Sequence, residues 1–185
     1  MRFDPTNDIQ ILSNNFVGEF NFPYSLNDLN QDIASYFERR PFKTQAWLGG
    51  LQQQIYGGVT CPYRSLGRMP PGPLCEAKNL IVEKFWKTEN LKPNVAYVQR
   101  TSNGVSVKEH RDPATDKEFT TILYLGDFVG RTLHTREQGI NLAPGMLIRL
   151  RCTTKTEVGE MRGPLHWASS HRGTCYTLIF NCSQR

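Results

Sequence analysis

The sequence lacks the long apolar run that a membrane-spanning helix needs. No stretch approaches the roughly 20 consecutive apolar residues that cross a bilayer, and Met1–Asp4 does not begin a secretory signal. The five cysteines form no CxxC pair and no zinc-module spacing, and their odd number favours reduced thiols over a disulfide framework. We therefore expect a soluble intracellular protein, cytoplasmic or nuclear, that has no membrane partner.

Internal repeats and low-complexity tracts are also absent from the sequence. The 185 residues suit a single domain, and contents of 38% hydrophobic and 11% aromatic residues argue against disorder. The formal net charge is +5 and the pI is near 9.0. This modest basic bias is compatible with a nucleic acid partner but is also common in proteins without one. The oligomeric state is left open by these features.

The N-terminal half, residues 1–93, is expected to be helical and to contribute a lid. One helix begins at Ser25, a good N-cap, and a second amphipathic helix runs from Pro73 to about Lys87. Before them, Phe16–Phe20 has the composition of an edge strand. The segment Gln45–Arg68 combines aromatic residues with two glycine pairs. It suits either a mobile loop that covers a substrate or a hairpin that packs its aromatic side chains on the core.

From residue 94 the hydrophobic period changes from that of a helix to that of a strand. A helical N-terminal part followed by short strands predicts an α+β protein with a mainly β core over residues 94–182. We expect a jelly roll, or double-stranded β-helix, with helices packed outside it. The expected strands are Val95–Gln99, Val105–Val107, Phe119–Leu125, Arg131–His134, Met146–Arg151 and Thr174–Phe180.

One motif at the end of an expected strand carries chemistry. Side chains two residues apart leave a strand on the same face, so His110 and Asp112 can enter one cavity. His166, from a distant strand, would complete a face of two histidines and one carboxylate, the pattern expected for non-haem Fe(II). His171 is a weaker rival for the third position, and His134 is expected to be an ordinary surface or hydrogen-bonded residue.

Together these segments resemble the Fe(II)/2-oxoglutarate dioxygenases, and most nearly the AlkB-type nucleic acid demethylases. The resemblance covers about residues 45–182 and implies Fe(II) held by His110, Asp112 and His166, with 2-oxoglutarate as cosubstrate. It also implies an enzyme that hydroxylates a substrate C–H bond. The residues that carry it are Asn94–Gly104, His110-Arg111-Asp112, Ala143-Pro144-Gly145, and His166 with the strand that closes the chain.

The chain departs from that family in the cosubstrate pocket. Cys175 and Asn181 stand where AlkB-type enzymes keep two arginines that hold 2-oxoglutarate, and Gln99 and Thr101 replace an Asn and a Tyr. A buried dicarboxylate needs a cation, and a bidentate guanidinium is the usual solution. We take Gln99, Thr101, Arg172 and Tyr176 as candidate cosubstrate contacts. The arginines that could supply the cation are Arg100, Arg131, Arg149, Arg151 and Arg172.

Three functions are compatible with the sequence. The first is oxidative demethylation or hydroxylation of nucleic acid bases, with Trp47, Tyr56, Tyr63 and Arg64 contacting the base. The second keeps the iron but oxidises a small molecule or uses a different reductant. The third is a non-catalytic module that binds nucleic acid through a basic face.

Overall fold

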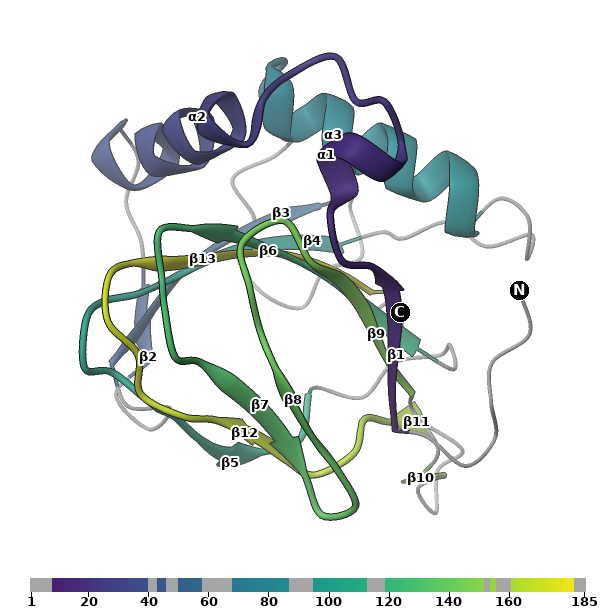
Figure 1. Ribbon diagram of the computed structural model, residues 1–185, viewed down its shortest axis with the longest axis vertical. Coiled ribbons are helices and arrows are strands. Elements are labelled where there is room, and N and C mark those ends of the chain that lie inside the picture. The colour runs from purple at the N-terminus through teal and green to yellow at the C-terminus, as the bar shows by residue number, and fades with distance from the viewer. Residues whose placement is uncertain are drawn as a thin grey trace.

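The computed structural model describes residues 8–39, 43–45, 50–57, 68–86, 95–112, 119–151, 154–155 and 161–181. Helices lie on one face of a large sheet, and a smaller sheet lies on its other side (Figure 1). No helix in these ranges is both long and apolar enough to cross a membrane. In chain order the elements are β1 (Ile9–Ser13), α1 (Phe16–Glu19), α2 (Leu26–Arg39), β2 (Lys43–Gln45), β3 (Leu51–Gly57), α3 (Pro73–Ile81), the π-helical turn η2 (Val82–Trp86), β4 (Val95–Thr101), β5 (Val107–His110), β6 (Phe119–Gly126), β7 (Thr132–Thr135), β8 (Gly139–Asn141), β9 (Leu147–Arg151), β10 (Thr154–Lys155), β11 (Met161–Arg162), β12 (His166–Ala168) and β13 (Cys175–Asn181).

The two main sheets have the antiparallel arrangement expected of a jelly roll. The seven-stranded sheet has the order β1-β9-β6-β13-β4-β3-β2, and the four-stranded sheet has the order β5-β12-β7-β8. Every strand pair between the described elements is antiparallel. The fold-class prediction, a mainly β core with helices packed outside it, is therefore confirmed.

The central strand β6 is buried along its whole length because both faces of the large sheet are covered. Leu123 and Leu125 belong to the core between this sheet and the helices, together with Leu29 and Ile33 of α2. Ile122 and Tyr124, which alternate with them, belong to the core between the two sheets. The period of two thus divides the interior into two apolar layers.

The helix predicted from Ser25 is confirmed as α2. The Asp28 amide donates to the Ser25 hydroxyl at 3.1 Å, and the Asp28 carboxylate accepts from the Ser25 amide at 2.8 Å. This reciprocal pair satisfies donors that a helix start leaves without intrahelical partners. The second predicted helix is also present as α3 and η2. Its first turn is fixed to α2 because the Asp32 carboxylate accepts from the Leu74 amide at 2.8 Å.

The prediction of an edge strand at Phe16–Phe20 is wrong, because Phe16–Glu19 forms the short helix α1. The Asn15 side chain accepts from the Gly18 amide at 3.2 Å, and the Glu19 carboxylate accepts from the Asn15 amide at 3.1 Å. These local side-chain bonds favour a helical turn over extended backbone.

The N-terminal half contributes strands to the large sheet in addition to its helices. β1 pairs with β9, while β2 and β3 form a hairpin that extends the large sheet beyond β4. Of the two alternatives, a mobile loop or a hairpin, the hairpin describes Lys43–Gln45 and Leu51–Gly57. Residues 58–67 lie outside the described ranges.

Candidate functional site

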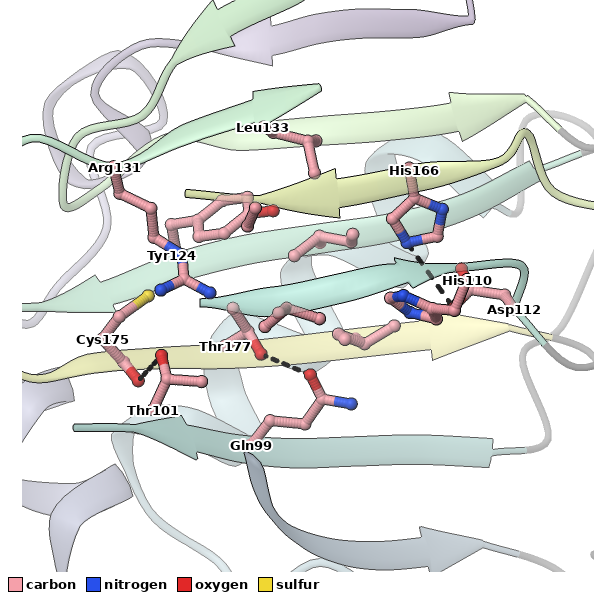
Figure 2. A pocket seen from close by; sticks show the side chains of 14 residues that line it. Gln99, Thr101, His110, Asp112, Tyr124, Arg131, Leu133, His166, Cys175 and Thr177 are labelled. Atoms are coloured by element: carbon pink, nitrogen blue, oxygen red, sulfur yellow. Dashed lines mark hydrogen bonds and ion pairs between the residues drawn. The ribbon is translucent and has the colours of Figure 1, made fainter. Parts of the chain in front are cut away.

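A cavity lies between the two sheets of the jelly roll. Figure 2 shows a histidine and carboxylate cluster at one end and an arginine beside a cysteine at the other. Strands β4, β6 and β13 supply one wall, and β5, β7 and β12 supply the opposite wall. The lining residues are Gln99, Thr101, Val107, His110, Asp112, Ile122, Tyr124, Arg131, Leu133, His166, Ala168, Cys175, Thr177 and Ile179.

The three predicted metal ligands meet at one end of this cavity. His110 and His166 are direct partners across the antiparallel pair β5 and β12, and their ring centroids are 4.4 Å apart. Asp112 Oδ1 lies 3.8 Å from His110 Nε2 and 3.9 Å from His166 Nε2. One ligand atom from each residue lies within 4.8 Å of the others. Strand pairing therefore brings together the three side chains that the sequence singled out.

Both histidines are oriented by backbone carbonyls close to them in the chain. His110 Nδ1 lies 2.7 Å from the Lys108 carbonyl, and His166 Nδ1 lies 2.9 Å from the Pro164 carbonyl. Because a carbonyl only accepts, each Nδ1 carries a proton, and in the neutral tautomer with this proton the lone pair for a metal is on Nε2. Burial, and next the neighbouring His166, lower the pKa of His110, which favours the neutral form that binds a metal.

Arg111 ties the two ligand-bearing segments together. Its NH1 donates to the Gly163 carbonyl at 2.7 Å, and Gly163 precedes the strand that carries His166. A Cβ on Gly163 would lie 3.8 Å from Asp112 Cβ, so this backbone packs directly beside the carboxylate. The residue between the two motif positions thus has a positioning role of its own.

The other end of the cavity contains Arg131, which is only 4% exposed. Its NH1 donates to His171 Nδ1, and His171 Nε2 lies 3.3 Å from the Thr101 carbonyl. Figure 2 shows the guanidinium next to the thiol of Cys175. Burial raises the pKa of Cys175 to about 11, so the thiol is neutral. Burial likewise raises the pKa of the Tyr124 phenol.

Two of the four predicted cosubstrate contacts line the cavity and two do not. Gln99 and Thr101 face it from β4. Tyr176 alternates with Cys175 and Thr177, so it points to the helix side, where its ring stacks on Phe37 at 5.9 Å. Arg172 is exposed, and its backbone forms a bridge with Val129. Tyr176 and Arg172 therefore lie outside the lining of this cavity.

Two further candidate arginines also turn toward the helices. Arg149 donates to the Phe85 carbonyl at 2.6 Å and lies 3.8 Å from the ring centroid of Phe119. Arg100 donates to the Gln52 side chain and lies over the ring of Phe37. Of the five arginines considered from the sequence, Arg131 is the one that lines the described cavity.

The predicted substrate-contacting residues are not placed by the described part of the chain. Trp47, Tyr63 and Arg64 lie outside it, and only the backbone of Tyr56 is described, on β3. Sequence reasoning missed Tyr124 and Thr177 as cavity residues. Strand alternation was the available signal, because side chains two residues apart on a strand face the same side. Thr177 lies two residues after Cys175, and Tyr124 lies two residues after Ile122.

Comparisons with known proteins add information at the level of the fold. No protein-family model matches the sequence, and no curated protein is significantly similar to it. The solved structures similar to it over nearly the whole chain include three with TM-scores of 0.60 or more. OsALKBH1 has a TM-score of 0.64 at 15% identity, covering 98% of this chain and 100% of its own.

The second is a 2OG-Fe(II) oxygenase family oxidoreductase from Burkholderia pseudomallei, with a TM-score of 0.60 at 16% identity, covering 96% of this chain and 89% of its own. The third is the viral collagen prolyl hydroxylase of Paramecium bursaria Chlorella virus-1 in its 2OG complex. It has a TM-score of 0.62 at 12% identity and covers 97% of this chain and 98% of its own. The chain therefore has the jelly-roll fold of the 2-oxoglutarate and Fe(II) oxygenases.

Proposed function

We propose that this protein is an Fe(II)- and 2-oxoglutarate-dependent oxygenase. The observation that carries the proposal is the group His110, Asp112 and His166, whose donor atoms lie within 4.8 Å at the end of a cavity inside the jelly roll. Two imidazoles and one carboxylate are the donor set expected for non-haem Fe(II), which needs open positions opposite them. The residues fit this metal: both rings are oriented through Nδ1, so in the neutral tautomer each Nε2 would be the metal-binding atom.

With Fe(II) and 2-oxoglutarate bound, O2 would be the oxidant and 2-oxoglutarate would supply two electrons: one oxygen atom would enter a substrate C–H bond as hydroxyl, and the other would enter the succinate formed as 2-oxoglutarate loses CO2. The residues of the chain position these reactants. Asp112 and the two histidines would hold the metal, and apolar side chains such as Ile122, Leu133 and Ile179 would limit water in the cavity.

For the substrate we propose a base of a nucleic acid, carrying a methyl group that is hydroxylated and then lost as formaldehyde. The supporting observations are the net charge of +5, the AlkB-type motifs and the similarity to OsALKBH1. Trp47, Tyr56, Tyr63 and Arg64 stay our predicted contacts to that base. The similarity to a collagen prolyl hydroxylase makes a proline-containing peptide the second substrate class to test.

The test combines iron binding with product analysis. Protein purified without oxygen is titrated with Fe(II), and succinate release is measured with methylated single-stranded oligonucleotides, with proline-rich peptides, and with neither. We expect one Fe(II) per chain and succinate release coupled to loss of the methyl group from the oligonucleotide. Coupled release with peptides alone would overturn the choice of substrate. Failure to bind Fe(II) would overturn the oxygenase assignment.

A further inference from the structure

Arg131 is a buried cation that has no anionic partner among the described residues. Its side chain is 4% exposed, and no Asp or Glu in the described ranges forms an ion pair with it. Its Nε is buried and has no hydrogen-bond partner among the described residues. A charged guanidinium left in this condition is costly, because water has been removed and neither a counter-ion nor a full set of acceptors replaces it. Such a group at the end of a cavity indicates an anionic ligand.

The backbone fixes Arg131 in this position. The Leu142 amide donates to the Arg131 carbonyl at 2.9 Å. Just before Arg131, Val129 and Arg172 exchange two backbone hydrogen bonds of 3.0 Å. That bridge places His171, the neighbour of Arg172, against the Arg131 side chain. The arginine is therefore held toward the cavity by the chain on both sides of it, as a preorganised binding group would be.

His171 orients the guanidinium without neutralising it. An arginine only donates, so His171 Nδ1 must accept from Arg131 NH1, and Nε2 must carry the proton that points to the Thr101 carbonyl. A neutral histidine in this tautomer occupies one donor of Arg131 and leaves the Nε proton for a ligand. Two parallel donors of a guanidinium edge match the two oxygens of a carboxylate.

We infer that Arg131 binds the distal carboxylate of the 2-oxo acid cosubstrate, in place of the arginine that this chain lacks on β13. The inference rests on the proposed function and extends it. Cys175 stands at the expected arginine position, and Figure 2 shows its thiol beside the Arg131 guanidinium, which reaches the same end of the cavity from the segment before β7. The cation would thus be supplied by a different segment, the one before β7, while the triad at the opposite end would take the 2-oxo acid group.

The test compares two 2-oxo acids that differ in the distal carboxylate. Chelation of a 2-oxo acid by anaerobic Fe(II)-loaded protein gives a visible charge-transfer band, which reports binding without turnover. 2-Oxoglutarate has the distal carboxylate and pyruvate lacks it. We expect the unmodified protein to bind 2-oxoglutarate far more tightly. In Arg131→Met the affinity for 2-oxoglutarate should fall at least about 30-fold, as for loss of a buried charge partner, while pyruvate binding is unchanged.

Two further variants make the result specific. Arg131→Lys keeps the positive charge but loses the two parallel donors of the guanidinium. Compared with Arg131→Met, it should retain part of the preference for 2-oxoglutarate. Arg172→Met removes an exposed arginine outside the cavity lining and should bind both acids like the unmodified protein. Circular dichroism and Fe(II) titration of each variant verify the fold and the metal site.

The possible failures are distinguishable from one another. If Arg131→Met keeps the preference for 2-oxoglutarate, the inference is overturned and the proposed function stands. If the iron-loaded unmodified protein forms no band with either acid, the cosubstrate assignment itself is overturned, and the role of Arg131 is overturned with it.

Discussion

The two ends of the cavity are held together by contacts of different range. At the triad end, each histidine is oriented by a carbonyl two residues before it, from Lys108 or Pro164. At the arginine end, Arg131 contacts His171 forty residues away, and His171 contacts Thr101 seventy residues away. The triad end therefore depends on short motifs and one strand pair, whereas the arginine end depends on three separate segments of the barrel.

This difference predicts how the two ends respond to change. Side chains at the triad end can be altered with effects confined to metal binding, because their supports are local. Backbone changes at the arginine end also alter the stability of the fold, because hydrogen bonds there join the turn after β4, the segment before β7 and the turn before β13. Four predictions follow from this contrast, beginning with the largest expected effect.

Replacing Asp112 by Ala removes the carboxylate of the triad and should weaken Fe(II) binding by at least about 100-fold, with loss of any oxidation. The matched control is Glu109→Ala, which removes an exposed carboxylate on β5 without touching the cavity. Anaerobic titration with Fe(II) measures both. The unfolding midpoint of the apo protein should be nearly unchanged in each. Equal Fe(II) affinities in the two variants would refute the metal assignment.

Replacing Gly126 by Ala should destabilise the turn that closes the arginine end by at least about 3 kcal/mol. Gly126 has φ +109°, pairs with Cys175, and a Cβ there would lie 2.1 Å from the Thr174 carbonyl oxygen. Gly104, with φ +77° and open space around its Cβ position, is the matched control. Gly104→Ala should cost about 1 kcal/mol, from backbone strain alone. Urea unfolding compares them, and equal losses would show that the close contact is unimportant.

Two buried arginines should differ in what they contribute to stability. Arg149→Met removes a hydrogen bond to the Phe85 carbonyl and packing on Phe119, and should lower the free energy of unfolding by about 1–3 kcal/mol. Arg131→Met removes a buried charge that has no anionic partner in the described part of the chain, and should change the stability of the apo protein by less than about 1 kcal/mol or increase it. Chemical denaturation without ligand measures both. A larger loss for Arg131→Met would mean that the residue is structural.

The smallest effect concerns pH. Burial, and next the charge of Arg131, lower the pKa of His171 below its usual 6.5. Its other polar neighbours are Asp127 and the carbonyls of Thr101 and Val105. Below pH 6.5 the unfolded chain binds a proton at this position that the folded protein does not, so acid favours unfolding.

The free energy of unfolding should therefore fall as pH drops from 6.5 toward the lowered pKa. The contribution of this single group is less than about 1.4 kcal/mol per pH unit. In His171→Gln the free energy of unfolding should decline less steeply over the same pH range. Any contribution of His110 is the same in the variant and in the unmodified protein. Urea unfolding between pH 5 and 8 measures the slopes. Parallel curves would show that His171 is not held neutral.

Much of the fold was predictable because the signals are local. The helix from Ser25 follows from a cap and its carboxylate partner, and β6 follows from an apolar run with turns on both sides. The failure at Phe16–Phe20 has a local cause too. The Asn15 and Glu19 side chains satisfy helical amides there, whereas apolar composition alone indicated a strand.

By itself the sequence determined which residues could form the triad, because His110 and Asp112 share a strand face and His166 follows at a strand of its own. Its resemblance to the AlkB-type enzymes also implied that the cations expected on the closing strand are replaced by Cys175 and Asn181. Only the tertiary structure decided which arginine lies in the cavity. Arg100, Arg149 and Arg131 have the same chemistry, and they differ in the side of the large sheet toward which the chain directs each side chain. That choice depends on how the two sheets and the helices enclose the chain, which no local pattern encodes.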